Sequence, residues 1–220
     1  LHCLRRDRLA EITETLETRR PAGIGLVLPA LVTEFDHPAM SRIIDELARA
    51  RFLSRIVVAL GGASAQQYAD VRRRFTRVRT PVDVLQVDHP ETVALLTDVE
   101  RQGLPTGTAG KGRTCWLALG HLLGRGDCDV VVFHDADIRD YSRHLLAALA
   151  FPIAMPELGL SFAKGFYARA NGQLYGRVTR LLVTPLVRAL ERCGASSPFL
   201  RFLADLHVAL DHDAGVGRAD

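Results

Sequence analysis

The sequence predicts an α/β protein built on a mostly parallel β-sheet that is flanked by helices. Short apolar runs typical of buried strands alternate with segments of helical periodicity, an order that favours parallel strands joined by right-handed crossovers. One run, Val130–Phe133, consists of apolar residues bounded by charge, as expected for a strand buried on both faces. With 220 residues, of which 48% are hydrophobic, the chain can bury one large core.

Each element before this run has its own signal. The strands are apolar runs closed by Gly, Pro or charged residues, and the helices place apolar residues three and four positions apart. Ser64 is the expected N-cap of the third helix. In chain order we expect a helix over 1–20, a strand over Gly23–Pro29, a loop over Ala30–Pro38, a helix over Pro38–Ala50, a strand over Arg55–Leu60, a helix from Ser64 to Phe75, a strand over Val82–Val87, a helix over Glu91–Gln102, a Gly-rich turn over Gly103–Gly112 and a helix over Arg113–Leu123.

The pattern changes after Asp137. Mixed polarity and several prolines replace the regular alternation of strands and helices. Here we expect a helix over Tyr141–Ala150 that Pro152 stops, a strand of mixed character over Gly159–Tyr167, a helix over Val178–Arg192 and a short helix over Phe199–Leu210.

The composition excludes several classes of protein. The formal net charge is only +3, and no basic stripe interleaved with aromatic residues argues for nucleic-acid binding. The four cysteines are scattered without a CxxC pair, which indicates a reduced, cytoplasmic chain rather than a disulfide framework or zinc site. No apolar run approaches the roughly 18 residues of a membrane span, and the charged N-terminal segment is unlike a signal peptide.

The strongest chemical signal is a pair of carboxylates after the Val130–Phe133 run. Asp135 and Asp137 are spaced i, i+2 at the carboxyl end of a predicted parallel strand, where α/β proteins bind ligands. Mg²⁺ and Mn²⁺ prefer carboxylate oxygens and often share them with substrate phosphates. The alternative is structural: Asp135 caps the following turn and Asp137 caps the next helix. His134, beside the pair, is more typical of a packed or hydrogen-bonded residue than of a metal ligand.

Two further segments carry groups suited to an anion. Lys111 lies between two glycines at a helix start, where backbone N–H groups and the helix dipole favour negative charge. The pattern is not a Walker A loop, because Gly112 follows the lysine instead of Ser or Thr. Tyr175–Arg180 offers a glycine, an arginine and a threonine, which suit a phosphate or carboxylate. The alternatives are a flexible turn with a solvated lysine and an ordinary capped helix with a basic face.

Taken in order, these segments resemble one family. It is that of the GT-A glycosyltransferases that make glucosyl-3-phosphoglycerate, with close relatives that make mannosyl-3-phosphoglycerate. The similar segments are Leu28-Pro29-Ala30-Leu31, Gly110-Lys111-Gly112, Asp135-Ala136-Asp137, Phe162–Arg169, Gly176-Arg177-Val178-Thr179 and Leu182–Leu186. The resemblance covers roughly Ile24 to Phe202. It implies a GT-A, Rossmann-like fold that is incomplete at the carboxyl terminus.

The resemblance also implies an activity. This is a metal-dependent, retaining transfer of glucose or mannose from UDP-glucose or GDP-mannose to 3-phosphoglycerate or glycerate, in compatible-solute or polysaccharide-precursor synthesis. The implied partners include Mg²⁺ or Mn²⁺ and a second copy in a homodimer. The implied ligand contacts are Pro29, Ala30, Leu31, Glu34, Lys111, Asp135 and Ala136 for the nucleotide sugar, Asp137 for the metal, and Gly176, Arg177, Val178 and Thr179 for the acceptor.

The resemblance also divides the chain. It implies a single domain over 1–220, with an N-terminal helix over 1–20, a nucleotide-sugar-binding part over 21–140, the start of an acceptor-binding part over 141–205 and a disordered tail over 206–220.

Two departures from the family are visible. Val32-Thr33-Glu34 stands where the family usually has Asn and two acids. After about Asp205 the family continues into a Gly-Glu-Phe-type segment and later a metal-ligand His, whereas this chain reads Leu206–Asp213 and soon ends. We therefore expect a donor half-site that lacks part of the metal and acceptor site.

Two other functions compete with a glycosyltransferase. One is a nucleotide-sugar-binding remnant without activity. The other is a nucleotidyltransferase, whose nucleotide loop would carry Gly and Arg directly after the first strand. Leu28–Thr33 contains neither residue, which counts against the second alternative.

Overall fold

The computed structural model describes residues 6–165 and 184–194. The chain divides into two compact units, Leu1–Gly165 and Phe166–Asp220. In the second unit the described residues form helix α7 (Thr184–Arg192), in agreement with the carboxyl-terminal half of the helix predicted over Val178–Arg192. The predicted helix over Phe199–Leu210 and the predicted tail over 206–220 lie outside the described residues.

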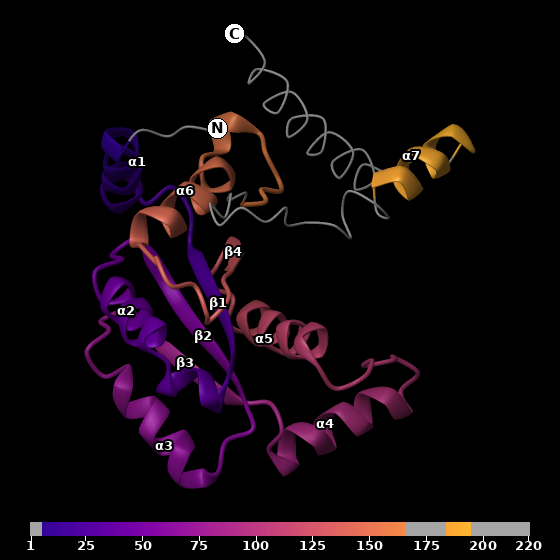
Figure 1. The fold of residues 1–220 in the computed structure, drawn as a ribbon. Coiled ribbons are helices and arrows are strands. Elements are labelled where there is room, and N and C mark those ends of the chain that lie inside the picture. Colours follow the sequence, from indigo (N-terminus) through magenta and orange to yellow (C-terminus); the bar gives the residue numbers. More distant parts are fainter. Residues whose placement is uncertain (1–5, 166–183, 195–220) are drawn as a thin grey trace, which may run out of the picture. The chain divides into compact units, whose positions relative to one another are not determined.

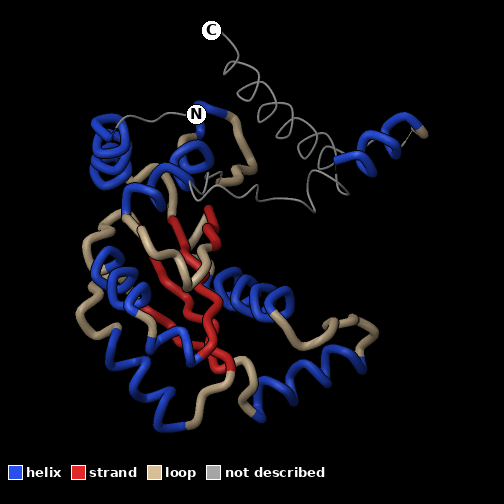
Figure 2. The backbone as a smooth tube through the Cα atoms, in the orientation of Figure 1, coloured by secondary structure: helices blue, strands red, loops and turns tan. Residues whose placement is uncertain are grey.

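The first unit is built on a four-stranded sheet in the order β3-β2-β1-β4 (Figure 1; strands red in Figure 2). Every pairing is parallel, so the predicted fold class is confirmed. The alternation of strands with helices along the chain is also as predicted. The strands are β1 (Ile24–Leu31), β2 (Leu53–Gly61), β3 (Val82–Gln86) and β4 (Val130–Phe133).

Helices cover both faces of this sheet (Figure 1). At the start of α3, for example, the Ser64 hydroxyl accepts from the Gln67 N–H, as predicted. The side-chain oxygen of Gln67 in turn accepts from the Ser64 N–H, which completes a capping box. No helix among the described residues is long and apolar enough to cross a membrane. The helices are α1 (Arg6–Arg19), α2 (Pro38–Leu47), α3 (Ala65–Arg74), α4 (Pro90–Arg101), α5 (Lys111–Arg125) and α6 (Arg143–Ala154), with 3-10 turns η1 (Val32–Asp36) and η2 (Pro156–Leu158).

The two faces of the sheet bury different cores, because successive side chains of a strand point to opposite faces. Leu26 and Leu28 of β1 join the larger core, to which α1, α2, α3 and α6 contribute. Val27, between them, joins a smaller core with Ala118 and Leu122 of α5. The smaller core therefore depends largely on how α5 packs.

Gly25 lets α5 approach the sheet closely. A Cβ at this position would lie 3.2 Å from Leu122 Cδ1 and 2.9 Å from Cys128 Sγ. A side chain there would force the side chains of Cys128 and Leu122 to shift. The cysteines in the described residues, Cys115, Cys128 and Cys193, are free thiols, as their scattered positions predicted.

The prediction that Val130–Phe133 is buried on both faces is wrong. The strand occurs where predicted, but β4 forms one edge of the described sheet, and Phe133 is 43% exposed. An apolar run indicates that a segment forms a packed strand, but it does not indicate whether the strand has one neighbouring strand or two.

Several boundaries also differ from the predictions. Helix α5 begins at Lys111, two residues earlier than predicted, and the predicted loop after Pro29 continues β1 to Leu31 before η1. Helix α6 runs through Pro152, because burial of Ala150 and Ala154 against the core offsets one lost backbone hydrogen bond. The described part of the predicted strand over Gly159–Tyr167, up to Gly165, forms no strand.

Neighbouring leucines on α5 test whether the smaller core holds this helix in place. Leu122 is 1% exposed and Leu123 is 64% exposed. Leu122→Ala should lower the free energy of unfolding by about 2–5 kcal/mol, because it opens a cavity against β1. Leu123→Ala should change it by about 0.5 kcal/mol or less. Urea denaturation followed by circular dichroism measures both, and equal effects would contradict the packing described for α5.

Candidate functional site

The register between β1 and β4 brings two predicted binding segments together. Val27 pairs with Phe133, and the His134 N–H donates to the Val27 carbonyl at 3.1 Å. From that point β1 continues to Leu31, while the segment after β4 continues into the Asp135–Asp137 turn. Both segments therefore lie at the carboxyl edge of the sheet, where parallel α/β sheets bind ligands.

Lys111 and Asp135 are in direct contact at this edge. The Lys111 ammonium donates to Asp135 Oδ1, although the two residues come from the first turn of α5 and the turn after β4. The bond to Asp135 raises the pKa of Lys111, and the carboxylate of Asp137 acts in the same direction from farther away. The lysine and the acidic pair, predicted separately from sequence, thus form one cluster.

The Lys111–Asp135 pair is open to solvent. The side chains are 64% and 51% exposed. Exposed ion pairs are typically worth about 1 kcal/mol or less, so a negatively charged ligand can displace Asp135 from the lysine at little cost. The helix start adds to this, because its N-cap residue Gly110 has no side chain with which to cap the first N–H groups of α5.

The structural alternative for Asp137 is wrong. Helix α6 begins at Arg143, and its N-cap is Ser142, whose hydroxyl accepts from the His144 N–H at 3.2 Å. Asp137 lies five residues before that cap and its side chain is exposed. The residue therefore has no capping role at this helix, and its carboxylate is available to solvent or a ligand.

His134 is part of the packing beneath the site. It is 6% exposed, its Nδ1 lies 3.1 Å from the Tyr141 hydroxyl, and the two rings meet edge to face at 5.3 Å. Burial lowers the pKa of His134 to about 4, against the opposing influence of Asp135. The prediction of a packed, hydrogen-bonded histidine is confirmed.

The end of β1 presents a mixed surface. Pro29 is half-buried, Ala30 is buried and Leu31 is 60% exposed. The Glu34 carboxylate accepts from the Leu31 N–H at 2.7 Å, which holds the strand end against η1. At the end of β1, Leu31 therefore offers the most exposed apolar surface and Pro29 offers less, while one Glu34 oxygen already has a partner. Ala136 is buried between the two exposed aspartates.

Sequence reasoning missed one segment at this edge. Gly61 pairs with Leu31, and a Cβ on Gly61 would lie 3.4 Å from the Leu31 side chain. Gly62 follows with φ +71°, and its N–H donates to Asp88 at 2.7 Å. The Gly-Gly pair at the end of a predicted strand was the available signal, because such pairs mark turns where backbone is approached closely.

The donor set suits a cation that also binds a ligand. Among the described residues, no group of three or more His, Cys, Asp and Glu side chains could hold a metal ion alone. Asp137, with Asp135 nearby, offers exposed carboxylate oxygens. Mg²⁺ and Mn²⁺ commonly take one or two carboxylates and complete their coordination with water and phosphate oxygens. The predicted acceptor residues, Gly176, Arg177, Val178 and Thr179, lie outside the described residues.

Comparison with known proteins gives a consistent result. No family model matches the chain. The chain is 39% identical over 211 residues to the glucosyl-3-phosphoglycerate synthase of Persephonella marina, covering 96% of the chain and 52% of that protein. It is 34% identical over 206 residues to the enzyme of the same name from Methanococcoides burtonii, covering 92% and 50%. The chain thus spans about half the length of the curated relatives it matches.

Solved structures share the fold. Glucosyl-3-phosphoglycerate synthase from Mycobacterium tuberculosis, in complex with Mn²⁺, UDP-glucose and phosphoglyceric acid, matches with a TM-score of 0.55 and 23% identity over 86% of the chain and 56% of that protein. Its complex with Mn²⁺, UDP and glucosyl-3-phosphoglycerate matches with a TM-score of 0.54 and 22% identity over 87% and 57%.

The parallel sheet with its flanking helices is the GT-A fold shared with these solved structures, which confirms the predicted fold class. More particularly, the chain is similar to the glucosyl-3-phosphoglycerate synthases over about half their length. The family resemblance seen in the sequence is therefore confirmed.

His134 should make stability depend on pH in a definite window. Its folded-state pKa of about 4 lies below its ordinary 6.5, so the unfolded chain binds the proton first as pH falls. The contribution of neutral His134 to the free energy of unfolding is fully present above pH 6.5. It is lost as the pH falls from 6.5 to 4, by at most about 3 kcal/mol.

Comparison with His134→Gln isolates this effect from other acid-titrating groups. The free energy of unfolding, measured by urea denaturation at each pH, should fall more steeply for the unmodified chain than for the variant across that window. Parallel curves would show that His134 is not buried in its neutral form.

Proposed function

We propose that this chain provides the nucleotide-sugar-binding site of a metal-dependent, retaining glucosyltransferase that uses 3-phosphoglycerate as acceptor. The observation that carries the proposal is the cluster of Lys111, Asp135 and Asp137 at the carboxyl edge of the sheet. The cluster combines a flexible lysine ammonium, a helix start and two carboxylates within one exposed site. These groups suit a diphosphate with its counter-ion.

Each described residue has a separate task in this proposal. Lys111 leaves Asp135 and binds a diphosphate oxygen, and Asp135 is then free to accept from a ribose or sugar hydroxyl. Leu31 and the half-buried Pro29 provide apolar contact for the nucleoside, beside Ala30 and Glu34. A cation held by Asp137 would supply positive charge that stabilises the leaving diphosphate.

The relatives favour UDP-glucose among the predicted donors. The Mycobacterium tuberculosis protein of the same fold has been solved with UDP-glucose, Mn²⁺ and phosphoglyceric acid, and also with Mg²⁺ and UDP. The same complexes favour Mn²⁺ or Mg²⁺ as the cation, and phosphoglycerate rather than glycerate as acceptor. Gly176, Arg177, Val178 and Thr179 remain the proposed acceptor contacts on the basis of the sequence resemblance.

The remaining predictions become part of this proposal. We assign 1–220 to one GT-A domain, with the nucleotide-sugar-binding part over 21–140 and the start of the acceptor-binding part over 141–205. The scattered cysteines favour a reducing, cytoplasmic location, and the family resemblance favours a homodimer. Calorimetry with UDP-glucose and GDP-mannose, followed by a product assay with 3-phosphoglycerate, tests binding and transfer separately; binding without product would identify a nucleotide-sugar-binding remnant.

Asp137→Ala tests the metal site. The affinity for UDP-glucose in the presence of Mn²⁺ should fall by at least about tenfold in the variant, because Asp137 is the carboxylate proposed to hold the cation. Isothermal titration calorimetry with and without Mn²⁺ measures the effect. Asp140→Ala is a matched control, since Asp140 is exposed and its carboxylate lies 3.9 Å from Arg42. Unchanged metal dependence in Asp137→Ala would refute the assignment.

Arg177→Ala tests the acceptor assignment. Loss of the guanidinium should raise the KM for 3-phosphoglycerate by about tenfold or more, since charge-assisted hydrogen bonds to phosphate are worth about 1.5–3 kcal/mol. Affinity for UDP-glucose, measured by calorimetry on the same variant, should change little. Equal losses for donor and acceptor would reject a role specific to the acceptor.

A further inference from the structure

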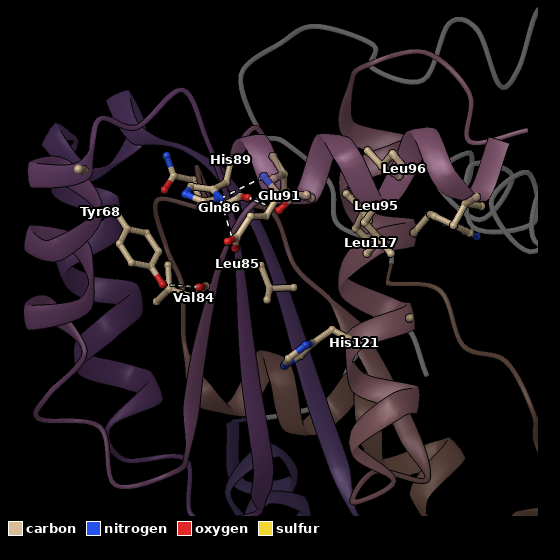
Figure 3. Close-up of a pocket in the computed structure, with 16 residues that line it drawn as sticks. Tyr68, Val84, Leu85, Gln86, His89, Glu91, Leu95, Leu96, Leu117 and His121 are labelled. Atoms are coloured by element: carbon tan, nitrogen blue, oxygen red, sulfur yellow. Dashed lines mark hydrogen bonds and ion pairs between the residues drawn. The ribbon is translucent and has the colours of Figure 1, made fainter. Parts of the chain in front are cut away.

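Helix α4 covers the sheet loosely. Leu96 is the one buried residue of this helix, whereas Val93 is 47% and Leu95 is 57% exposed. A cavity of about 910 Å³ lies between α4, the end of β3 and α5. In Figure 3, Leu95 and Leu96 of α4 and Leu117 of α5 border it, with Leu85 of β3 across the gap. An apolar helix face and an apolar cavity therefore lie next to each other without being packed.

The amino-terminal end of α4 is anchored. The Thr92 hydroxyl donates to the Gln86 carbonyl at 3.0 Å, and the Val87 N–H donates to the Leu60 carbonyl at 2.9 Å, which ties the preceding segment to β2. These bonds leave the carboxyl-terminal end as the part of the helix that can swing.

The segment after α4 is hydrogen-bonded to the helix. The Leu104 N–H donates to the Val99 carbonyl at 3.3 Å, and the buried Thr106 donates its hydroxyl to the Glu100 carboxylate. Residues 90–106 are therefore one body, which we name the α4 flap. The flap ends where the glycine-rich turn begins.

The glycine-rich turn joins the flap to the proposed donor site. Gly107 has φ +72°, and a Cβ on Gly107, Gly110 or Gly112 would meet no atom within 4 Å. A second cavity of about 430 Å³ lies under this turn, and Trp116 lines both cavities. The turn leads directly into Lys111, the first residue of α5. A movement of the flap and the binding of a ligand at Lys111 would therefore both affect the glycine-rich turn that lies between them.

We propose that the α4 flap closes onto α5 when a nucleotide diphosphate binds at Lys111. The inference rests on the proposed function. A diphosphate at the start of α5 attracts the N–H groups of the open turn, and the turn draws the swinging end of α4 inward. Closure buries the exposed faces of Leu95 and Trp116, which is favourable in water, and excludes solvent from one side of the donor site.

Trp116 reports closure directly. It is the only tryptophan of the chain and is 50% exposed. Adding UDP-glucose with Mn²⁺ should reduce acrylamide quenching of its fluorescence by about twofold and shift its emission to the blue, because closure removes water from the indole.

Two glycine substitutions on α5 separate closure from simple contact. Gly120 lines the larger cavity and Gly124 does not, and a Cβ at either would meet no atom within 4 Å. Gly120→Leu fills the cavity and should hold the flap open, so Trp116 stays quenchable and donor affinity falls by about tenfold. Gly124→Leu should behave like the unmodified chain. Both replace glycine with a better helix former, so neither weakens α5.

Calorimetry on the same samples makes each outcome decisive. Donor binding with unchanged quenching in the unmodified chain overturns the flap. Equal protection of Trp116 in Gly120→Leu and the unmodified chain also overturns it, because the donor would then shield the indole by itself. An absence of donor heat in the unmodified chain overturns the proposed function, and the flap with it.

Discussion

The parallel register between β1 and β4 determines where the end of β1 and the acidic turn lie. Because Val27 pairs with Phe133, the end of β1 and the Asp135–Asp137 turn emerge side by side. Side chains alternate along a strand, so a slip of one residue would turn Asp135 and Asp137 toward the opposite side and move Lys111 out of reach. The buried contact between His134 and Tyr141 holds the chain directly before the acidic pair and so preserves this register.

Helix α5 extends the same constraint to the lysine. In its carboxyl-terminal half, Leu122 lies close to Gly25 of β1, where a Cβ would come within 3.2 Å of its methyl groups. Beside it, His121 Nε2 lies 2.8 Å and Arg125 Nε lies 3.4 Å from the Asp83 carboxylate of β3. Because the carboxyl-terminal half of α5 is anchored on two strands, the direction of its amino-terminal end is fixed. The position of Lys111 therefore follows from packing that is remote from the site, and the lysine itself needs no further support.

Much of the site could be predicted from the sequence because its signals are local. An apolar run followed by Asp135 and Asp137 predicts a strand end with two carboxylates, and Gly110-Lys111-Gly112 predicts a helix start with a cation. Local pattern alone does not predict that these two features touch; the family resemblance does, because it assigns Lys111 and Asp135 to the same nucleotide sugar. That contact depends on the sheet order, which places β4 beside β1, and no local pattern encodes the neighbours of a strand.

The wrong predictions have the same origin. Val130–Phe133 shows the composition of a central strand, yet it lies at an edge of the described sheet. Pro152 carries a strong local signal for the end of a helix, yet buried alanines on both sides keep α6 intact. At Pro152 long-range packing outweighs a local preference worth about 3 kcal/mol. Element identity was therefore predictable, whereas neighbours and ends were not.

The exposure of the Lys111–Asp135 pair determines how easily its partners can be exchanged. A buried pair would resist a ligand, because breaking it leaves an unpaired charge away from water. This pair is more than half exposed on both sides, so water replaces either partner at small cost. The acid keeps the lysine charged and near the helix start until a stronger anion arrives. Under the proposed function a diphosphate would outcompete Asp135 for Lys111, because it carries more negative charge than one carboxylate and can also accept from the N–H groups of α5, and Asp135 would then be free for a hydroxyl of the same ligand.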